Sequence, residues 1–258
     1  MDKVKEEKIE EILKAEIPEG VVIKKGIIDE SSWKPKTELG RKVKAGEITT
    51  VEQLLQQDKK FLESGIIDIL LKDVQSDLLN VGQSKGKFGG GKRSIWRQTQ
   101  KKTCEGNKPK FAALAVVGNR DGYVGIGHGK AKETMPAREK SIKAAKLNII
   151  SIRRGCGAWD CNCSNPHSIP FKVEGKCGSA RIILIPAARG TGLCIEKECK
   201  RILEMAGIKD VYSKTFNSKT KLNLLYACFN ALKELSRTKI QEQNQKELGI
   251  LVGSSQHE

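Results

Sequence analysis

The sequence predicts an α+β protein made of two consecutive units, at about residues 92–165 and 166–240, behind an N-terminal extension. Three observations support this fold class: short apolar runs of strand length, helical segments with apolar residues on one face, and glycine-containing turns between them. Apolar residues make up 38% of the 258 residues. This share is enough to build packed cores, and it excludes a chain that is disordered throughout.

The extension, residues 1–91, contains short helical patterns with few apolar residues. Residues 3–17 predict a charged helix, and Thr50 with Gln53 resembles a capping box that opens a second helix. The apolar stretch IIDILLKDVQSDLL follows at 66–79. These segments lack a strong core of their own, so we expect them to pack on the body of the protein or on a neighbour.

The first unit starts with a hairpin. FAALAVV and YVGIG read as buried strands, and the Asn119–Gly122 turn suits them because Asp and Gly tolerate a positive φ. A helix follows, with Met135, Ile142 and Ile149 on its apolar face and lysines over much of the remainder. LNIISIRR then leaves this helix as another strand.

The second unit alternates strands with helices. IPFKV and SARIILIPA predict two strands joined by a turn at Glu174–Gly175. A helix at 194–206, a strand in KDVYSKTF and a helix at 220–236 follow, each with apolar residues at the matching period. The segment 241–258 is a polar tail that we expect to fray.

The charge is concentrated in the middle of the chain. The net charge is +16 and the pI is about 9.5, which indicates a polyanionic partner. Residues 91–173 hold 17 Lys and Arg against 5 Asp and Glu, whereas residues 1–90 hold 16 against 17. Aromatic residues, at 5%, leave little material for stacking on bases. The opening residues are charged, unlike a secretory signal, and no apolar run is long enough for a membrane span.

The segment 84–110 has nine basic residues, one acid and three consecutive glycines. Two interpretations stay open, a flexible linker and a loop that follows a phosphate backbone, and the density of charge favours the loop. Glycine-rich turns with nearby lysine or arginine recur further on, and structured RNA is the natural target of such a surface. The RNA-binding candidates are Lys85, Lys87, Lys92, Arg93, Arg97, Lys101, Lys102, Lys108, Lys110, Arg120, Lys130, Lys132, Arg153 and Arg154.

Catalytic motifs are missing from the sequence. VGIGHGK resembles a dinucleotide fingerprint, but its glycines end a hairpin and no acid follows at the required distance. His128 is followed by Gly129 and Lys130, so the zinc-deaminase pattern fails. Walker loops, nucleophile elbows and His-Glu-x-x-His are absent as well. We therefore predict a protein that is not an enzyme.

The stretch RRGCGAWDCNCSNPHSIP is the strongest candidate metal site. Cys156, Cys161, Cys163 and His167 follow the spacing C-x4-C-x-C-x3-H, and one tetrahedral zinc ion would satisfy all four. Cys177 is the alternative fourth ligand. Structural zinc and a set of free thiols both stay open, and the density of cysteines leans towards metal.

Several long stretches resemble the small-subunit ribosomal protein five family in its archaeal form, called protein two in eukaryotes. They are RDGYVGIGHGKAKE, AKLNIISIRRGCGAWDC, PHSIPFKVEGKCGSARIILIPAARGTGL and MAGIKDVYSKTF, and the match covers roughly residues 33–240. The resemblance implies a double-stranded-RNA-binding-like α-β-β-β-α domain at 92–165. It implies a second α+β domain, of the ribosomal-protein-five type, at 166–240.

The same resemblance implies where the protein works. It places the chain in the cytoplasm, within the small ribosomal subunit near the mRNA entrance, bound to small-subunit rRNA and beside proteins three, four and eight. It implies roles in subunit assembly and decoding fidelity. CEGNKPKF matches a basic loop that reaches rRNA. PAARGTGL matches a contact with protein four, and its candidate residues are Arg189, Gly190, Thr191 and Gly192.

Two other functions fit the sequence less well. A free regulator that binds double-stranded RNA would need neither the second unit nor PAARGTGL. A metal-dependent nucleic-acid enzyme would need a general base near the cysteines, and Asp160 is the only nearby acid. Disulfides are disfavoured for a ribosomal protein, because the cytosol is reducing. SKGKFGGGKRS looks like an insertion relative to the family.

Overall fold

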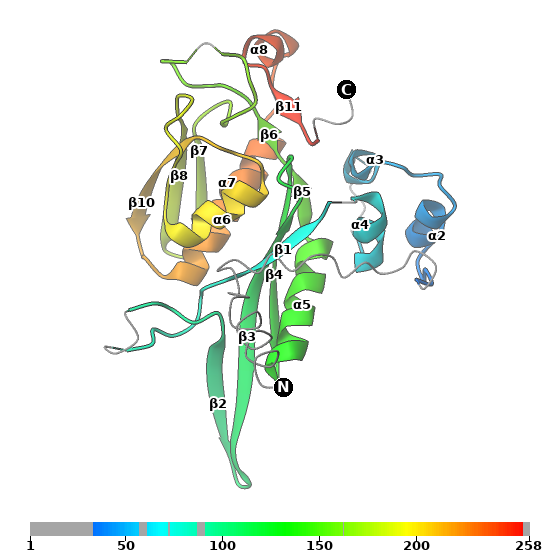
Figure 1. The fold of residues 1–258 in the computed structure, drawn as a ribbon, viewed down its shortest axis with the longest axis vertical. Coiled ribbons are helices and arrows are strands. Elements are labelled where there is room, and N and C mark those ends of the chain that lie inside the picture. The colour runs from blue at the N-terminus through cyan, green and yellow to red at the C-terminus, as the bar shows by residue number, and fades with distance from the viewer. Residues whose placement is uncertain (1–32, 57–60, 72, 87–90, 162, 255–258) are drawn as a thin grey trace, which may run out of the picture.

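Two sheets built mainly from antiparallel strands, with helices packed on them, form the body of the protein (Figure 1). The computed structural model describes residues 33–56, 61–71, 73–86, 91–161 and 163–254. The first sheet has the order β1-β3-β4-β5, with β2 also on β3, and the second has the order β7-β8-β10-β9. The predicted α+β class is therefore confirmed. No helix among the described residues is long and apolar enough to cross a membrane.

The first sheet is organised around one long strand, β3 (Gly106–Gly118). Residues 114–118 of β3 pair with β1 (Gln75–Leu79), and residues 106–112 pair with β2 (Arg97–Thr103). The other edge of β3 pairs with β4, which in turn pairs with β5. The stretch 66–79 thus contributes a sheet strand in addition to a helix. The remaining bounds in this sheet are β4, Tyr123–Ala131, and β5, Ile149–Ser151.

The glycines of VGIGHGK serve helix packing. Helix α5 (Thr134–Leu147) lies across β3 and β4. A Cβ atom on Gly127 would come within 2.0 Å of the Ala145 backbone nitrogen, and one on Gly129 within 2.3 Å of the Ala137 carbonyl. Side chains at these two positions would push α5 off the sheet, so the motif is a close helix–strand contact.

The second sheet lies against two helices, and α7 packs on β7 and β8. The predicted turn at Glu174–Gly175 is wrong, because both residues lie inside β7 and the chain turns at Gly178, whose φ is 58°. Gly175 is needed in the strand, since a Cβ there would come within 2.1 Å of a carbonyl in α7. The bounds are β7, Val173–Cys177; β8, Ala180–Pro186; β9, Leu193–Cys194; α6, Lys197–Met205; β10, Val211–Asn217; and α7, Lys221–Arg237.

A single hydrophobic core joins the two units. Leu79, Leu114 and Val124 of the first sheet belong to the same buried cluster as Ile202 and Leu225 from the helices of the second. This shared burial fixes the two sheets against each other, because apolar surface removed from water stabilises the contact.

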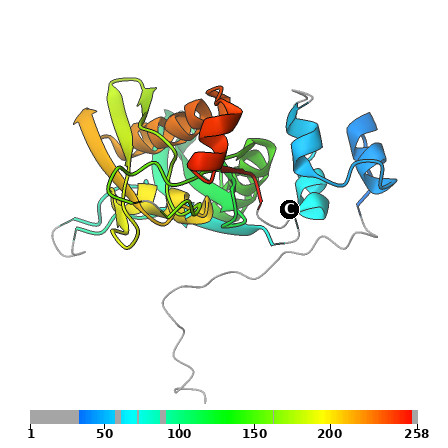
Figure 2. The same cartoon turned by 90° about the horizontal axis from the view of Figure 1, so that it is seen from above.

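The extension packs on the body, as expected from its weak cores, and Figure 2 shows its helices to one side of the sheets. Leu54, Ile66 and Ile67 are fully buried in a cluster that also holds Val117 and Tyr123 of the first sheet. Residues 3–17, predicted to be helical, lie outside the described residues. The helices of this region are α2, Glu38–Lys44; α3, Val51–Gln56; and α4, Ser64–Leu70.

The C-terminal segment folds back onto the body, so the expected fraying from residue 241 is wrong for the described part. It forms α8 (Glu242–Glu247) and β11 (Leu251–Val252). Strand β11 pairs with β6 (Arg153–Arg154), which leaves the first unit. Backbone hydrogen bonds, which polar sequence does not reveal, hold this segment in place.

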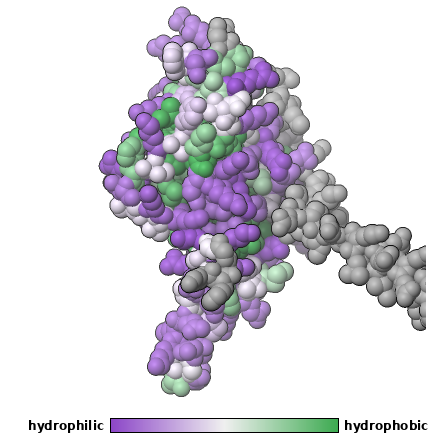
Figure 3. Space-filling model, turned by 60° about the vertical axis from the view of Figure 1, so that its left-hand side comes forward, coloured by the Kyte–Doolittle hydropathy of each residue, from purple (hydrophilic) through white to green (hydrophobic). Residues whose placement is uncertain are grey.

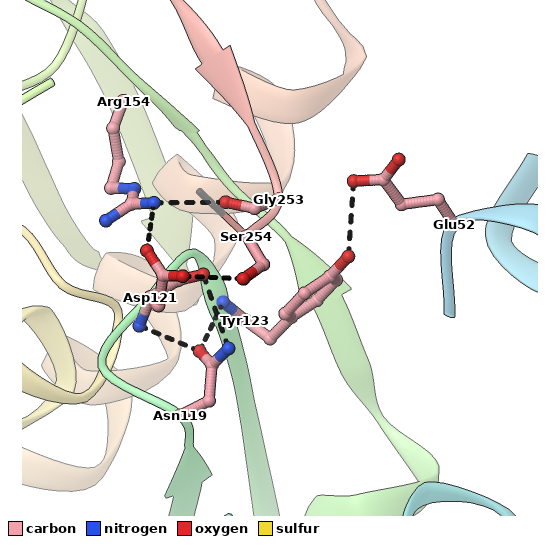
Figure 4. A network of polar contacts seen from close by, with 7 residues as sticks. All are labelled: Glu52, Asn119, Asp121, Tyr123, Arg154, Gly253 and Ser254. Carbon is pink, nitrogen blue, oxygen red and sulfur yellow. Dashed lines mark hydrogen bonds and ion pairs between the residues drawn. The ribbon is translucent and has the colours of Figure 1, made fainter. Parts of the chain in front are cut away.

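A polar network at the β3–β4 turn links the N-terminal extension and the C-terminal segment to the body (Figure 4). The Arg154 guanidinium pairs with Asp121 at 2.5 Å, and the Ser254 hydroxyl donates to the other oxygen of that carboxylate, also at 2.5 Å. The Tyr123 hydroxyl donates to Glu52 of the extension at 3.2 Å. The positive φ expected in this turn is found at Gly122, at 92°, and at Arg120, at 58°, and not at Asp121.

Candidate RNA interface and metal cluster

A β-hairpin arm projects from the body where the sequence suggested a linker or loop. It consists of β2 and the first half of β3, with Cys104 and Glu105 between the two strands. Six of the seven residues of β2 and the first five of β3 are exposed, and the arm is almost entirely hydrophilic (Figure 3). Backbone pairing therefore presents the basic residues of 97–110 on rigid strands.

The strand register gathers positive charges on one face of the arm. Lys101 lies opposite Lys108, and Thr99 opposite Lys110. Directly paired residues share a face, so these side chains project together. Lysine opposite lysine is a repulsive pair, which an anion between them would relieve. Glu105 contacts Lys108 at 2.5 Å, but both side chains are largely exposed.

A basic cleft continues this face towards α5. It has a volume of about 570 Å³ and lies where the arm meets the start of the helix. Four lysines, one glutamate, Ala131 and Pro136 line it, so the cleft is suited to an anionic group. Lys140 is a lining residue that the sequence analysis did not single out, because only the fold brings α5 beside the arm. The lysines are Lys110, Lys130, Lys132 and Lys140.

The positive charges on this face affect the pKa of the His128 imidazole. Partial burial, together with the charges of Lys130 and Arg97, lowers the pKa of its imidazole below the ordinary value. The ring is therefore neutral at pH 7. Arg97 lies opposite Ala112, and Ala112 lies opposite Lys130 of β4, so the register brings both cations to one face.

The remaining candidates divide into three groups. Lys85, Lys92 and Arg93 are exposed at a short bridge between Ser84 and Arg93, whereas Lys87 lies outside the described residues. Lys102 is exposed but lies opposite Asn107, on the other face of the arm from Lys101.

The third group lies at the far end of β3, away from the arm. Arg120 lines a separate cleft of about 600 Å³ with Gly192, Lys200 and Lys209 among its neighbours. Arg153 donates a hydrogen bond to the Thr238 carbonyl. Arg154 is 6% exposed and held by Asp121 and the Gly253 carbonyl, so its guanidinium is not presented to solvent. The prediction that Arg154 binds RNA therefore gains no support from its surroundings, because its guanidinium is buried and paired with an internal carboxylate.

The cysteine loop closes into a compact cluster. Gly155 and Ser168 form an antiparallel bridge that brings the two ends of the loop together. Inside it, the ligand atoms of four residues lie within 4.8 Å of one another. A tetrahedral zinc ion with ordinary Zn–S bonds separates its ligands by about 3.8 Å. His167 belongs to the cluster and Cys177 does not; the four residues are Cys156, Cys161, Cys163 and His167.

The pKa values of two thiols in the cluster are shifted in opposite directions. The backbone N–H of Arg189, followed by the neighbouring thiol of Cys163, lowers the pKa of Cys161 to about 6. Burial raises the pKa of Cys156 to about 11. An N–H that donates to sulfur favours the thiolate, which is the form that binds metal.

A buried carboxylate completes the surroundings of the cluster, and sequence analysis missed it. His167 Nδ1 lies 2.7 Å from Oδ2 of Asp210, and the two side chains are 7% and 6% exposed. The Nε2 atom faces Cys161 Sγ at 3.8 Å. A carboxylate on the outer nitrogen is the usual partner of a metal-binding histidine. No local signal could have identified Asp210, which lies 43 residues away.

The segment Arg189–Gly192 forms a turn between β8 and β9, in which Arg189 and Gly190 are exposed and Thr191 and Gly192 are partly buried. Gly190 has φ 90° and Gly192 has φ 74°. A Cβ atom on either glycine would meet no atom within 4 Å. The glycines are therefore required by the backbone conformation and leave an open surface outside the turn.

The fold, with its basic arm and two successive units, has the layout of a ribosomal protein, and comparison with protein families supports this class. Residues 95–153 match the family described as Ribosomal protein S5, N-terminal domain. Residues 175–246 match Ribosomal protein S5, C-terminal domain.

Relatives that match most of the chain identify the family. The protein named small ribosomal subunit protein uS5 from Nanoarchaeum equitans is 44% identical over 229 residues, covering 88% of this chain and 98% of that protein. The protein of the same name from Methanocaldococcus jannaschii is 44% identical over 227 residues, covering 88% and 97%. The chain belongs to the ribosomal protein uS5 family, a structural and non-enzymatic family, which confirms the resemblance and the expectation that it is not an enzyme.

Proposed function

We propose that the chain is a structural constituent of the small ribosomal subunit in the cytoplasm and binds small-subunit rRNA through the hairpin arm and the adjoining basic cleft. One observation supports the RNA contact most directly: the register places Lys101 against Lys108 beside Lys110 on an exposed face, and the cleft adds further lysines. An isolated protein gains nothing from such repulsion, whereas phosphates would neutralise it.

Replacing Lys108 and Lys110 together with alanine tests this proposal. Each lost phosphate contact should flatten the slope of log K against log salt by about 0.7–0.9, so the pair should flatten it by up to about 1.8. A matched control replaces Lys176 and Lys214, which are also exposed on strands, in the second sheet. Binding to small-subunit rRNA fragments is measured from low to moderate salt. Equal slopes for both double variants would remove the arm from the interface.

We infer that the turn Arg189–Gly192 is a contact with a neighbouring ribosomal protein, which for this family is protein four, near the mRNA entrance. Proteins three and eight are the other proposed neighbours. Glycines that have a positive φ and whose Cβ positions face open space support a surface kept free of side chains for a partner. Through this contact the chain would support assembly and decoding fidelity.

Substituting Gly190 with arginine tests the contact. Gly46 offers a matched control, because it also has a positive φ, 81°, and open space around its Cβ position. Gly190→Arg should change misreading rates in ribosomes that still assemble, and Gly46→Arg should not. Identical misreading in both variants would leave the turn without a role in fidelity.

We further propose that Cys156, Cys161, Cys163 and His167 hold one structural zinc ion. Three thiolates and an imidazole form a donor set that zinc prefers, and all four atoms are already gathered. The loop is ordered by polar contacts and not by an apolar core, because Trp159 is 99% exposed.

Metal analysis of the purified full chain tests the zinc proposal. One equivalent of zinc is expected in the native protein and none after Cys163→Ser. Cys104→Ser is the control, because Cys104 lies at the exposed end of the arm. Cobalt substitution should give the absorption of a tetrahedral site with three sulfur ligands. Native protein that neither contains nor takes up either metal would exclude the site.

A further inference from the structure

The cluster and the turn Arg189–Gly192 are connected through one buried carboxylate. Asp210 is 4% exposed and precedes β10. Its Oδ2 atom faces His167 Nδ1 at 2.7 Å. Its Oδ1 atom accepts the backbone N–H groups of Gly190 at 3.1 Å and Gly192 at 2.8 Å. The two oxygens of a single side chain therefore serve the histidine of the cluster and the glycines of the turn.

The orientation of His167 makes this connection sensitive to metal. A neutral imidazole has one N–H and one lone pair. Metal on Nε2, which faces Cys161, fixes the N–H on Nδ1, where it points at Asp210. Metal-bound histidines are commonly held this way, and the outer partner affects both the tautomer and metal affinity.

Backbone contacts hold Asp210 beside the cluster. Ser168 Oγ donates to the Asp210 carbonyl at 2.5 Å, and the Lys209 N–H donates to the His167 carbonyl at 2.8 Å. The turn thus reaches the imidazole of the cluster through Asp210.

The turn depends on these polar contacts. No atom lies within 4 Å of the Cβ positions of Gly190 and Gly192, and glycine loses more conformational freedom on ordering than any other residue. A turn with two such residues needs outside donors or acceptors to select one conformation. Here the side-chain acceptor is Asp210 Oδ1, and the Val211 N–H donates to the Gly192 carbonyl at 3.2 Å.

We propose that metal in the cluster sets the conformation of the turn Arg189–Gly192 through His167 and Asp210, so that the protein-contact surface is preorganised only when the cluster is loaded. Asp210 is a positioning residue that acts through His167 and through the glycine amides. The proposal rests on the proposed zinc site and deepens it, since it assigns the metal a role beyond the loop that holds it.

Two variants of the full chain separate the parts of this connection. His167→Cys keeps four metal ligands but removes the ring that reaches Asp210. Asp210→Asn keeps one acceptor oxygen, which cannot serve both the histidine N–H and the two glycine N–H groups. Amide hydrogen exchange at Gly190 and Gly192 is measured by NMR in each variant, beside metal content and zinc affinity. The Gly122 amide, which donates to the Ala206 carbonyl at 3.1 Å, is the internal reference.

The expected result has three parts. Zinc-loaded wild type protects both glycine amides, and stripping the metal with a chelator speeds their exchange at least tenfold without changing Gly122. Zinc-loaded His167→Cys shows the same loss of protection although its metal is retained. Asp210→Asn loses the protection and binds zinc about 10- to 100-fold more weakly, which a role confined to the turn would not cause.

Failure of the coupling can be told from failure of the zinc site. Unchanged glycine exchange in stripped wild type, or in zinc-loaded His167→Cys, overturns the coupling while the metal content still supports zinc. Unchanged zinc affinity in Asp210→Asn also overturns it, even where the turn loosens. Wild type that takes up no zinc overturns both, and metal analysis alone reports that outcome.

Discussion

The hairpin arm and the cysteine loop both lack a hydrophobic core, yet they are ordered by different means. The arm is a pair of exposed strands held by regular backbone hydrogen bonds, with its charges turned outward. The loop has little regular structure, and its polar side chains converge on a small buried volume. Order in the arm therefore comes from the backbone and leaves its side chains free for a partner. Order in the loop comes from its side chains, which contact one another and Asp210.

This contrast predicts that losing the metal costs stability and that losing the charges of the arm does not. Cys163→Ser should lower the free energy of unfolding by about 4 kcal/mol under zinc at about 1,000 times its Kd, a Tm decrease of about 8–16 °C. Lys108→Ala with Lys110→Ala should change stability by less than about 0.5 kcal/mol. Calorimetry with zinc present makes the comparison. Similar Tm values for the two variants would contradict it.

Arg154 tests the same contrast, because it is a basic residue whose side chain is buried and paired with Asp121. Arg154→Met leaves the Asp121 carboxylate without its cation, and removing one partner of a largely buried pair should cost about 3 kcal/mol. The salt dependence of rRNA binding should stay at the wild-type slope. Denaturant unfolding and salt titration on the same preparation give both values. A flattened slope with normal stability would instead assign Arg154 to the interface.

A charge reversal on the arm should weaken RNA binding and raise the stability of the protein. Lys101→Glu places a glutamate opposite Lys108, which replaces a repulsive cross-strand pair with an attractive one. We expect a gain of about 0.2–1 kcal/mol in stability and weaker binding to rRNA fragments. Lys102→Glu, opposite Asn107 on the other face, is the control. Tighter RNA binding by Lys101→Glu would exclude phosphates from this face.

The smallest expected effect is a pH dependence from His128. Burial, together with the charges of Lys130 and Arg97, lowers its pKa in the free protein, and nearby phosphates would raise it. The pKa is then higher in the complex, so binding should strengthen as the pH falls from 8 towards 5.5. The gain in affinity should stay below about tenfold, because a difference of one pKa unit between the free protein and the complex changes the affinity tenfold. His128→Gln should remove it, and a wild-type pH dependence in that variant would assign the effect elsewhere.

Local pattern predicted much of the fold but failed where a segment had no apolar period. The helix at 220–236 and the strand FAALAVV were predicted correctly, because burial of one face leaves a regular apolar pattern. The arm was predicted as a linker or a loop because exposed strands need no apolar residues. The segment after residue 241 looked frayed because its order comes from backbone pairing with β6.

The sequence by itself determined the α+β class, the concentration of charge at 91–173 and the cluster of cysteines with His167 within one short stretch. These features depend on composition and on neighbours a few residues apart, which sequence displays directly. The tertiary structure alone decided that His167, and not Cys177, joins the cluster, that Asp210 lies behind it, and that Asp121 binds Arg154. Those contacts join residues 33 and 43 positions apart. Sheet order and a shared core bring them together, and no local period encodes either one.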